Sequence, residues 1–567
     1  MADPSIPEST AELLLQRMKS LGVDYVFGNA GTDFPSLIEA FARVPESGLD
    51  LPQPVLVAHE TVAVGMAHGY YLASGRAQTV MAHVNVGLAN ALMGVLNAAT
   101  DNVPLLMCSG RTPLTERGRP GSRSRPIHWG QEMRDQSAMV REAVKWDYEL
   151  RYPEQAALIV QRALAIADSD PMGPVYLSLP REVVAEPVSG ALPLETRQQP
   201  VKAGTPHPEA VAAAVKLLRS AANPVIVAQR PVGSDDGRAL AAFAERFAIP
   251  VVDFWASRNV IGTDHPLFAG GDAATWLTDA DVIVTVEALV PWLIDQENAP
   301  WDARIIAIGP DPLFSRTPLR SFPVDVALGG SGELAIDALN RGLIEFEDSL
   351  HAIVSERRAR CARLIEEQRA AALARAQGGN GSPMSSAWVS LCLSQAKDAN
   401  AVVFNELGCD PSVMDFARPA TLFSTSFSGG LGWGLPAALG YQLTDRERLV
   451  IACVGDGSYI FANPVACHQV SMAERLPVLT VVFNNGTWGA VRRATLAMYP
   501  HGAAARSNAM PLTQLSPSPD YAAVARAHGL WAEQVRDGTA LPDAIERAIS
   551  AIRNDAVPAL LDVSVAV

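Results

Sequence analysis

The sequence has no excess of basic residues and no long apolar run. Its 45 Lys and Arg stand against 60 Asp and Glu, so the formal net charge is −15 and nothing marks a surface for nucleic acid or an anionic membrane. No apolar run approaches the length that spans a bilayer. The first residues, MADPSIPESTAELL, have neither the basic nor the apolar region of a secretory signal. We therefore expect a cytoplasmic protein with no nucleic-acid partner and no membrane partner.

Cysteines are few and scattered. The chain has six, none of them in a CxxC pair, which argues against a disulfide framework and against a cysteine-based zinc site. Hydrophobic residues make up 49% and charged residues 19% of the chain, as in a soluble globular protein. At 567 residues the chain exceeds a single ordinary core, so we expect several domains.

Helical stretches alternate with short apolar runs in three successive segments, a pattern typical of parallel sheets covered by helices. Two breaks separate the segments: a Pro-rich polar stretch at 186–208, and GGNGSPMSS at 378–386, which follows a charged helical stretch. We expect α/β domains over 1–185, 203–342 and 385–567. The apolar runs are Asp24–Phe27, Val55–Val57, Leu105–Cys108 and Val175–Leu179 in the first segment, and Pro224–Ala228, Pro250–Phe254, Val282–Val286 and Ile305–Ile308 in the second.

Oxygen-bearing side chains follow two neighbouring apolar runs of the third segment. The run Leu449–Val454 leads into Gly-Asp-Gly at 455–457, and the run Val478–Phe483 leads into Asn-Asn-Gly at 484–486. Sheets of this class bind ligands at the carboxyl ends of their strands. One carboxylate with amide and backbone oxygens suits a Mg²⁺ that is shared with a phosphate, and the glycines allow close backbone approach. Each motif alone would indicate a turn, but the pair at this spacing favours a metal–phosphate site.

The two motifs together resemble the diphosphate-binding motif of thiamine-diphosphate-dependent enzymes, in the group of benzoylformate decarboxylase, acetohydroxyacid synthase and pyruvate oxidase. The resemblance covers essentially the whole chain. It implies three doubly wound parallel-sheet domains, in the order pyrimidine-binding, central and diphosphate-binding, with thiamine diphosphate and Mg²⁺ as cofactors. It further implies that Asp456, Asn485 and the backbone carbonyl of Thr487 hold the metal, and that the turn residues bind the cofactor: Gly455, Asp456, Gly457 and Ser458.

Two more motifs fit the cofactor. Glu60 follows an apolar run and opens the helical stretch ETVAVGMAHG, and the resemblance implies that it hydrogen-bonds N1′ of the aminopyrimidine. A carboxyl group in an apolar pocket has a raised pKa and can share such a proton. In SFSGGLGWGLPAALG (426–440), the resemblance implies that the Gly429 carbonyl contacts N4′ and that Leu431 holds the cofactor bent. Taken alone, Glu60 would indicate a carboxylate at a helix N-terminus, and the stretch 426–440 would indicate a loop with one core leucine.

Three residues are candidates for the substrate pocket. In FGNAGTDF, Thr32 stands where benzoylformate decarboxylase-like members carry a serine, although a helix N-cap is the alternative. His83 ends an expected strand at the position of a substrate-facing histidine in those members, and its titration near neutrality suits proton transfer. Gln131, in HWGQE, matches the glutamine of an F-Q-E motif in related synthases, against the alternative of a surface loop.

The central segment departs from the family pattern. The stretch at 286–301 has Trp292 where benzoylformate decarboxylase would supply a second histidine, and no flavin-binding stretch is present. We expect non-oxidative cleavage of a 2-oxo acid through an enamine, with a homodimer as the minimum unit and a homotetramer as the assembly. The alternatives are an acetolactate-synthase-like carboligase forming acyloins, a lyase of CoA thioesters or ketones, or a catalytically silent thiamine-diphosphate-binding relative.

Overall fold

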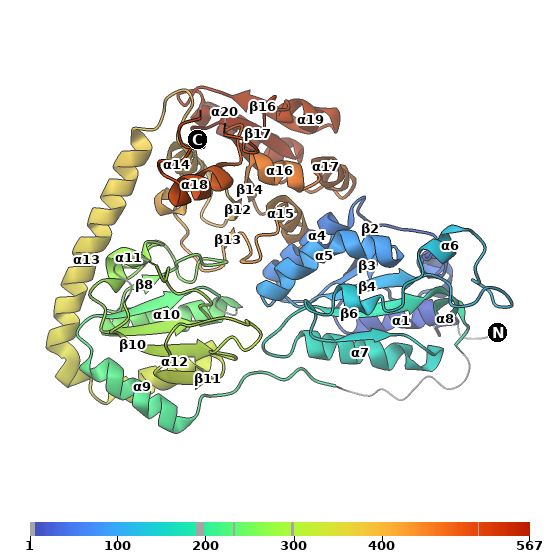
Figure 1. The fold of residues 1–567 in the computed structure, drawn as a ribbon, viewed down its shortest axis with the longest axis horizontal. Helices are drawn as coiled ribbons and strands as arrows, with labels where there is room; N and C mark the ends of the chain where they lie inside the picture. The colour runs from blue at the N-terminus through green and yellow to red at the C-terminus, as the bar shows by residue number, and fades with distance from the viewer. Residues whose placement is uncertain (1–5, 189–197, 231–232, 296–299, 508–509) are drawn as a thin grey trace.

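Three parallel sheets form the framework of the molecule (Figure 1). The computed structural model describes residues 6–188, 198–230, 233–295, 300–507 and 510–567, so part of the first expected linker lies outside the described residues. Each sheet has helices on both faces, which confirms the predicted class of doubly wound α/β domains.

The first sheet has six parallel strands in the order β2-β1-β3-β4-β6-β5. They are β1 (Tyr25–Gly28), β2 (Gln53–Leu56), β3 (Thr79–Ala82), β4 (Leu106–Arg111), β5 (Asp147–Glu149) and β6 (Val175–Pro180). The associated helices are α1 (Thr10–Ser20), α2 (Pro35–Ala42), α3 (Val44–Ser47), α4 (Glu60–Ser74), α5 (Val84–Thr100), α6 (Ile127–Gly130), α7 (Ala156–Ala167) and α8 (Arg181–Ala185).

The third sheet repeats this strand order with different sequences, as β13-β12-β14-β15-β17-β16. Its strands are β12 (Val402–Glu406), β13 (Leu422–Ser424), β14 (Val450–Gly455), β15 (Leu479–Asn484), β16 (Trp531–Val535) and β17 (Ala559–Ser564). Its helices are α14 (Ser386–Ala396), α15 (Gly434–Gln442), α16 (Asp456–Phe461), α17 (Pro464–Ala473), α18 (Gly489–Met498), α19 (Tyr521–Ala527) and α20 (Leu541–Asp555).

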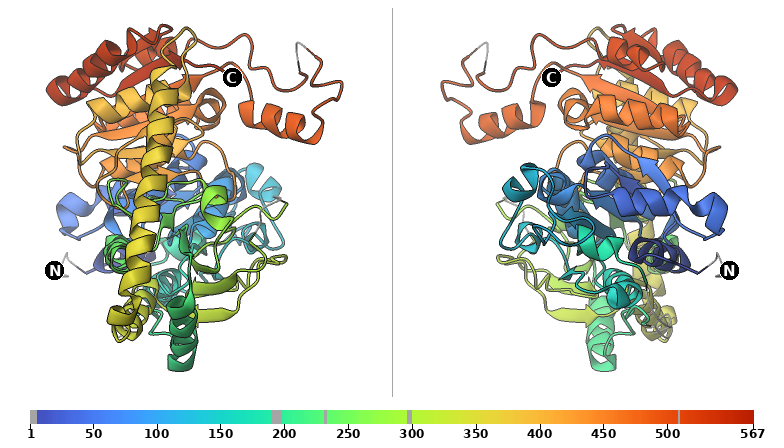
Figure 2. Two further views of the ribbon diagram at one scale, coloured as in Figure 1. Left: turned by 90° about the vertical axis from the view of Figure 1, so that its left-hand side faces the viewer. Right: turned by 90° about the vertical axis from the view of Figure 1, so that its right-hand side faces the viewer.

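The central sheet has the order β11-β10-β9-β7-β8. Its strands are β7 (Pro224–Ala228), β8 (Val251–Val252), β9 (Val282–Val286), β10 (Arg304–Gly309) and β11 (Val326–Gly329), with helices α9 (Pro208–Ser220), α10 (Gly233–Phe247), α11 (Ala273–Leu277) and α12 (Gly332–Ile344). The charged stretch predicted to be helical is α13 (Glu347–Gln377), a single helix of 31 residues that runs from the central to the third domain (Figures 1 and 2).

The first and third domains share one apolar core, which is formed where α4 packs against α15. The contact is close because small residues face each other. A Cβ on Gly69 of α4 would stand 1.9 Å from the carbonyl oxygen of Ala437, and one on Gly440 of α15 would stand 1.9 Å from that of Met66. The helix backbones therefore touch, and the two domains are held as one unit.

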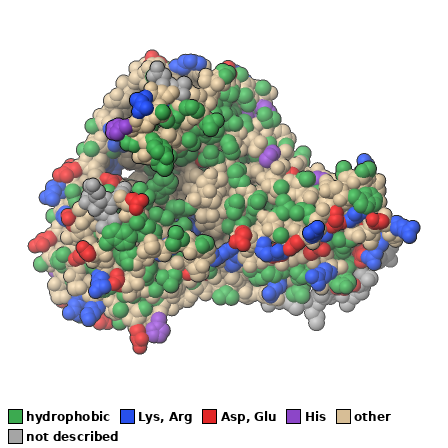
Figure 3. All heavy atoms as spheres, viewed as in Figure 1, with side chains coloured by type: hydrophobic (Ala, Val, Ile, Leu, Met, Phe, Trp, Pro, Cys, Tyr) green, Lys and Arg blue, Asp and Glu red, His purple; other side chains and the backbone are tan. Residues whose placement is uncertain are grey.

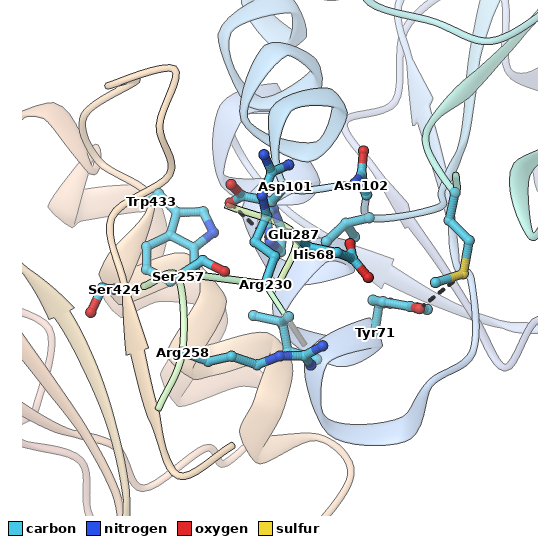
Figure 4. A pocket seen from close by; sticks show the side chains of 13 residues that line it. His68, Tyr71, Asp101, Asn102, Arg230, Ser257, Arg258, Glu287, Ser424 and Trp433 are labelled. Carbon is cyan, nitrogen blue, oxygen red and sulfur yellow. Dashed lines mark hydrogen bonds and ion pairs between the residues drawn. The ribbon is translucent and has the colours of Figure 1, made fainter. Parts of the chain in front are cut away.

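All three domains meet around a small buried polar cavity of about 40 Å³ (Figure 4). His68 of α4 lies with its Nε2 3.8 Å from Asp101 Oδ2, and Arg230 from the end of β7 reaches the carbonyl oxygen of Thr100. Burial lowers the pKa of His68 to about 3 and raises that of Asp101 to about 6. Trp433 closes the cavity from the third domain. None of the predicted site residues lines this junction.

Helix α18 extends away from the body of the third domain (Figure 2). None of its residues is buried, and Val491 and Met498 are exposed. Apolar side chains also gather on the surface of the third domain and along its border with the first (Figure 3). Among the described residues, no helix has the length and apolarity required to cross a membrane.

The close packing of α4 on α15 can be tested with Gly69→Ala. The added methyl group meets backbone, which cannot rotate away, so we expect a destabilisation of about 1–3 kcal/mol from overpacking. Urea unfolding of the purified protein would measure it. Gly329→Ala is the matched control because no atom lies within 4 Å of the Cβ position there. Equal stability of the two variants would contradict the close contact.

Candidate active site

The candidate residues of the first domain lie at the carboxyl ends of three adjacent strands. β1 pairs with β2 on one side and with β3 on the other, so successive connections leave β1 in opposite directions. Such a reversal opens a crevice at the carboxyl edge of a parallel sheet, where ligands bind. Thr32 follows β1, Glu60 follows β2 and His83 follows β3.

Glu60 is the first residue of α4 and is only 5% exposed. Two carboxamides hold its two oxygens: Asn29 donates to Oε1 at 3.1 Å and Asn90 donates to Oε2 at 3.2 Å. Neither Asn29 nor Asn90 is singled out by the sequence motifs. The carboxyl group is therefore held in a buried position by two neutral amide donors.

His83 stands at the entrance of the helix that follows β3, where it is the N-cap residue of α5. Its Nδ1 lies 2.5 Å from Asp33 Oδ1, and its Nε2 lies 3.3 Å from Nε2 of Gln131. The hydrogen bond to Asp33 raises the pKa of His83, while partial burial opposes this rise. The structure thus brings His83 and Gln131 together, as we expected of pocket residues, and adds Asp33, which the sequence did not single out.

Thr32 is exposed beside this group. The following helix, α2, begins at Pro35 with Phe34 at its N-cap and without a side-chain cap. The alternative that Thr32 caps the helix is therefore wrong, because the helix begins too late in the sequence. Its hydroxyl remains available at the carboxyl edge of the sheet.

The Gly-Asp-Gly and Asn-Asn-Gly motifs meet at the carboxyl edge of the third sheet. β14 and β15 are parallel neighbours with Gly455 opposite Phe483. Asp456, 3% exposed, accepts a hydrogen bond from the Gly457 amide at 2.8 Å and another from the Gly486 amide at 2.7 Å. Burial is the main cause that raises the pKa of this carboxyl group. The carboxylate thus joins the two motifs directly.

Asn485 and Thr487 complete this edge. Oδ1 of Asn485 accepts hydrogen bonds from the backbone amide of Thr487 at 2.9 Å and from its hydroxyl at 3.0 Å. Ser458 is buried two residues after Asp456. A cleft of about 410 Å³ opens beside these residues and is also lined by Arg492 and Ser518. Asn485 and Thr487 thus line a cleft with room for a ligand, and Asp456 lies buried behind them, bonded to the Gly486 amide.

The loop that carries Gly429 and Leu431 is fixed at both ends. On one side, the Asn97 side chain donates to the Gly430 carbonyl at 2.9 Å. On the other, Glu406 at the end of β12 accepts hydrogen bonds from the amides of Gly432 and Gly434, both at 2.6 Å. Glu406 has no exposed surface, and its burial raises its pKa to about 7. Leu431 is half-buried between these anchors, and Gly429 is exposed.

Trp292 does not belong to this site. It is 2% exposed and packs edge-to-face on Phe322 and Trp301 within the core of the central domain. The residue that this segment carries in place of a histidine is therefore a core residue of the central domain. The central domain contributes no side chain to the hydrogen bonds of His83 or Glu60 described above.

Within one chain, Glu60 and Asp456 each form their described hydrogen bonds inside their own domain. The Glu60 carboxyl bonds to Asn29 and Asn90 of the first domain, whereas Asp456 bonds to backbone of the third. Asn97, which holds the Leu431 loop, lies seven residues beyond Asn90 on α5, which is roughly 10 Å along the helix. The residues around Glu60 and those around Asp456 thus form two separate sets of hydrogen bonds.

Family comparisons match all three domains. The model described as the N-terminal TPP binding domain of thiamine pyrophosphate enzymes matches residues 8–139, the central domain matches 211–339, and the C-terminal TPP binding domain matches 407–563. Together these models cover most of the chain.

Three similar proteins are named as decarboxylases. The chain is 28% identical to a probable 2-ketoarginine decarboxylase (AruI) of Pseudomonas aeruginosa, over 94% of this chain and 91% of that protein. It is also 28% identical to benzoylformate decarboxylase of the same organism, over 96% of each. The structure of a thiamine diphosphate-dependent 4-hydroxybenzoylformate decarboxylase of Rhodococcus jostii RHA1 superimposes with a TM-score of 0.76, at 21% identity, covering 98% of this chain and 99% of that one.

The fold, the joined motifs and the matches to all three family models lead to one identification. The chain belongs to the thiamine pyrophosphate enzymes, and its cofactor is thiamine diphosphate.

Proposed function

We propose that this enzyme releases CO₂ from a 2-oxo acid without oxidation and delivers a proton to the carbon that has lost it. The observation that carries the proposal is the arrangement of His83 between Asp33 and Gln131, at the same sheet edge as Glu60. It is a positioned proton donor beside a cofactor-binding carboxyl group. The two P. aeruginosa relatives named above, both called decarboxylases, support this choice.

The residues present fit the cofactor. When bound, thiamine diphosphate supplies a carbanion that adds to the carbonyl carbon and an electron sink for the bond that breaks. Glu60, buried and held by two amides, would share a proton with the aminopyrimidine nitrogen, as an acid in a poorly solvated site can. The Gly429 carbonyl and the Leu431 side chain would contact the cofactor from the anchored loop of the third domain.

The third-domain edge fits Mg²⁺ shared with a diphosphate. The described residues hold no cluster of three His, Cys, Asp or Glu, so the metal would rely on mixed oxygen ligands. Asp456, the amide oxygen of Asn485 and the carbonyl of Thr487 supply these. Mg²⁺ keeps part of its coordination for phosphate and water, which a site with one carboxylate allows. Gly455, Gly457 and Ser458 would lie against the diphosphate.

His83 would act in the second half of the reaction. The bond to the carboxylate carbon breaks and CO₂ leaves; His83 then gives its Nε2 proton to the remaining carbon and regains one from water. General acid catalysis of this kind typically contributes about 10²–10⁴-fold. Gln131 beside Nε2 and the Thr32 hydroxyl would orient the substrate carboxylate.

Two copies of the chain would complete each site. In one chain the Glu60 half and the Asp456 half make separate contacts, so we infer that the first domain of one copy faces the third domain of another. Exposed apolar residues near these edges support such an interface: Val86 and Leu96 of α5, with Ile460, Phe461 and Val465 at α16 and α17. Exposed apolar residues that gather on a surface commonly mark a protein interface. A homodimer is the unit that we propose, and a homotetramer the larger assembly.

The reaction can be tested directly by product analysis. The purified enzyme with thiamine diphosphate and Mg²⁺ would be offered benzoylformate, 4-hydroxybenzoylformate, 2-ketoarginine and pyruvate. We expect equal amounts of CO₂ and of the corresponding aldehyde from at least one of them. Acetolactate as the sole product, formed from pyruvate, would instead show a carboligase.

Replacing the cofactor-binding carboxyl group provides a second test. Glu60→Gln keeps the size and one of the two acceptor oxygens but cannot share the proton, so we expect kcat to fall by about 10²–10⁴-fold with the fold intact. Turnover and thermal melting would be measured together. Glu333→Gln, an exposed residue at the start of α12, is the control. A Glu60→Gln enzyme of normal rate would refute the role.

The metal site makes a separate prediction. Asp456→Asn removes the charged ligand, so we expect the affinity for Mg²⁺ and thiamine diphosphate to fall by about 10–100-fold, the usual size of such losses around metal sites. Calorimetric titration of the apoprotein would measure both affinities. Asp537→Asn, in an exposed turn where an amide oxygen can accept the same backbone bond from Thr539, should bind normally. Unchanged affinity in Asp456→Asn would place the metal elsewhere.

A further inference from the structure

Asp33 uses both of its carboxylate oxygens on the strand–helix junction of His83. Oδ1 lies 2.5 Å from His83 Nδ1, and Oδ2 accepts a hydrogen bond from the Val84 amide at 3.1 Å. The Asp33 side chain is 4% exposed, whereas that of His83 is 20% exposed. One buried carboxylate therefore holds both the imidazole ring and the backbone that carries it.

The pair is enclosed by glycine backbone on two sides. A Cβ on Gly31 would stand 2.0 Å from His83 Nδ1, and a Cβ on Gly110 would stand 1.7 Å from Asp33 Oδ2. Neither position can carry a side chain without displacing the pair. Val84 next to His83 has a φ of 36°, an unusual backbone state for a β-branched residue. Such a state persists only where the surroundings impose it, and here Asp33 bonds to the amide of that residue.

The direction of the hydrogen bonds decides which ring nitrogen is active. A carboxylate accepts, so Nδ1 carries a hydrogen and donates it to Asp33. The other nitrogen, Nε2, is then the atom that faces Gln131 and the exposed side of the ring. The amide nitrogen of Gln131 can only donate, so a neutral ring accepts from it through Nε2. A protonated ring presents a donor at Nε2, and Gln131 then has to turn its amide oxygen toward it. Fixing Nδ1 in this way sets both the ring orientation and the tautomer.

We propose that Asp33 is a positioning residue, which aims Nε2 of His83 at the substrate carbon and keeps that nitrogen protonated between turnovers. This inference rests on the proposed function, in which His83 donates the proton. Asp33 itself does not touch the substrate. It acts through His83 in the way that a buried carboxylate orients a catalytic imidazole in other enzymes.

The charged groups that bear on His83 give the direction of the pH effect. They are Asp33, from the loop after β1, and Glu60, at the start of α4; the bond to Asp33 is the largest of the causes that raise the pKa of His83. A proton donor loses activity as pH rises through its pKa. Removing the charge of Asp33 lowers that pKa, so the alkaline limb of the kcat profile should move to lower pH.

The test compares Asp33→Asn, His83→Ala and the double variant in the thiamine diphosphate- and Mg²⁺-loaded enzyme, with the 2-oxo acid found to be turned over. For Asp33→Asn we expect kcat to fall by about 10²-fold, at the lower end of the range for proton-transfer catalysis, with KM changed by no more than a few-fold. The alkaline limb should shift to lower pH. The position of that limb does not depend on the fraction of enzyme that is folded, so partial unfolding cannot imitate the shift.

The double variant separates a positioning role from a structural one. If Asp33 acts through His83, the double variant should be no slower than His83→Ala, because contacting residues of one unit are not additive. Asp272→Asn is the control, since asparagine caps a helix as well as aspartate does and Asp272 is the exposed N-cap of α11.

The outcomes distinguish this inference from the proposed function. Full activity of His83→Ala would remove the proton-donor role and the proposed function in its present form. An inactive His83→Ala combined with an Asp33→Asn enzyme of unshifted pH profile would overturn the positioning role alone. An additive loss in the double variant would likewise show that Asp33 acts independently of His83.

Discussion

The backbone contact between α4 and α15 determines how the parts of the site are distributed. Helix α4 begins with Glu60 and, nine residues later, reaches Gly69 against Ala437 of α15. A contact without side chains between the helices tolerates little sliding, because close-packed backbones have no rotamers to adjust. The first and third domains therefore form a single rigid pair around a shared core, and the orientation of Glu60 relative to the Asp456 edge is fixed in each chain.

That fixed orientation explains why function requires assembly in our proposal. Glu60 bonds to Asn29 and Asn90, and Asp456 bonds to Gly457 and Gly486, so each half is ordered before any partner arrives. Preorganised groups cost little to align when a ligand binds. Because each half is already ordered, the step that remains is the association of two copies of the chain. The exposed apolar residues of α5 and α16 are suited to that task.

The sequence predicted the fold class and the chemistry of the cofactor more readily than the pocket. The run Val282–Val286 coincides with β9 because polar residues bound it on both sides. The strand expected to end at His83 is β3, which ends at Ala82. Its limits are harder to predict, since TVMA passes into the apolar helix α5 without a turn signal and periodicity cannot divide such a run. The burial of Trp292 in the central domain could not be predicted for a related reason: a sequence shows which residues are apolar but not which core they enter.

Asp33 and Glu406 show what a motif comparison omits. Asp33 lies in the turn after β1 and Glu406 is the last residue of β12, and neither carries a signal of its own, because acidic residues in such places are common. Their roles emerge only when a second residue, far away in sequence, is placed against them: His83 for Asp33, and the Gly432 and Gly434 amides for Glu406. Asp33 nevertheless follows from a physical question that can be asked of any catalytic histidine. One ring nitrogen works, so the other must be held, and a buried carboxylate near the end of the adjacent strand is the group best able to hold it.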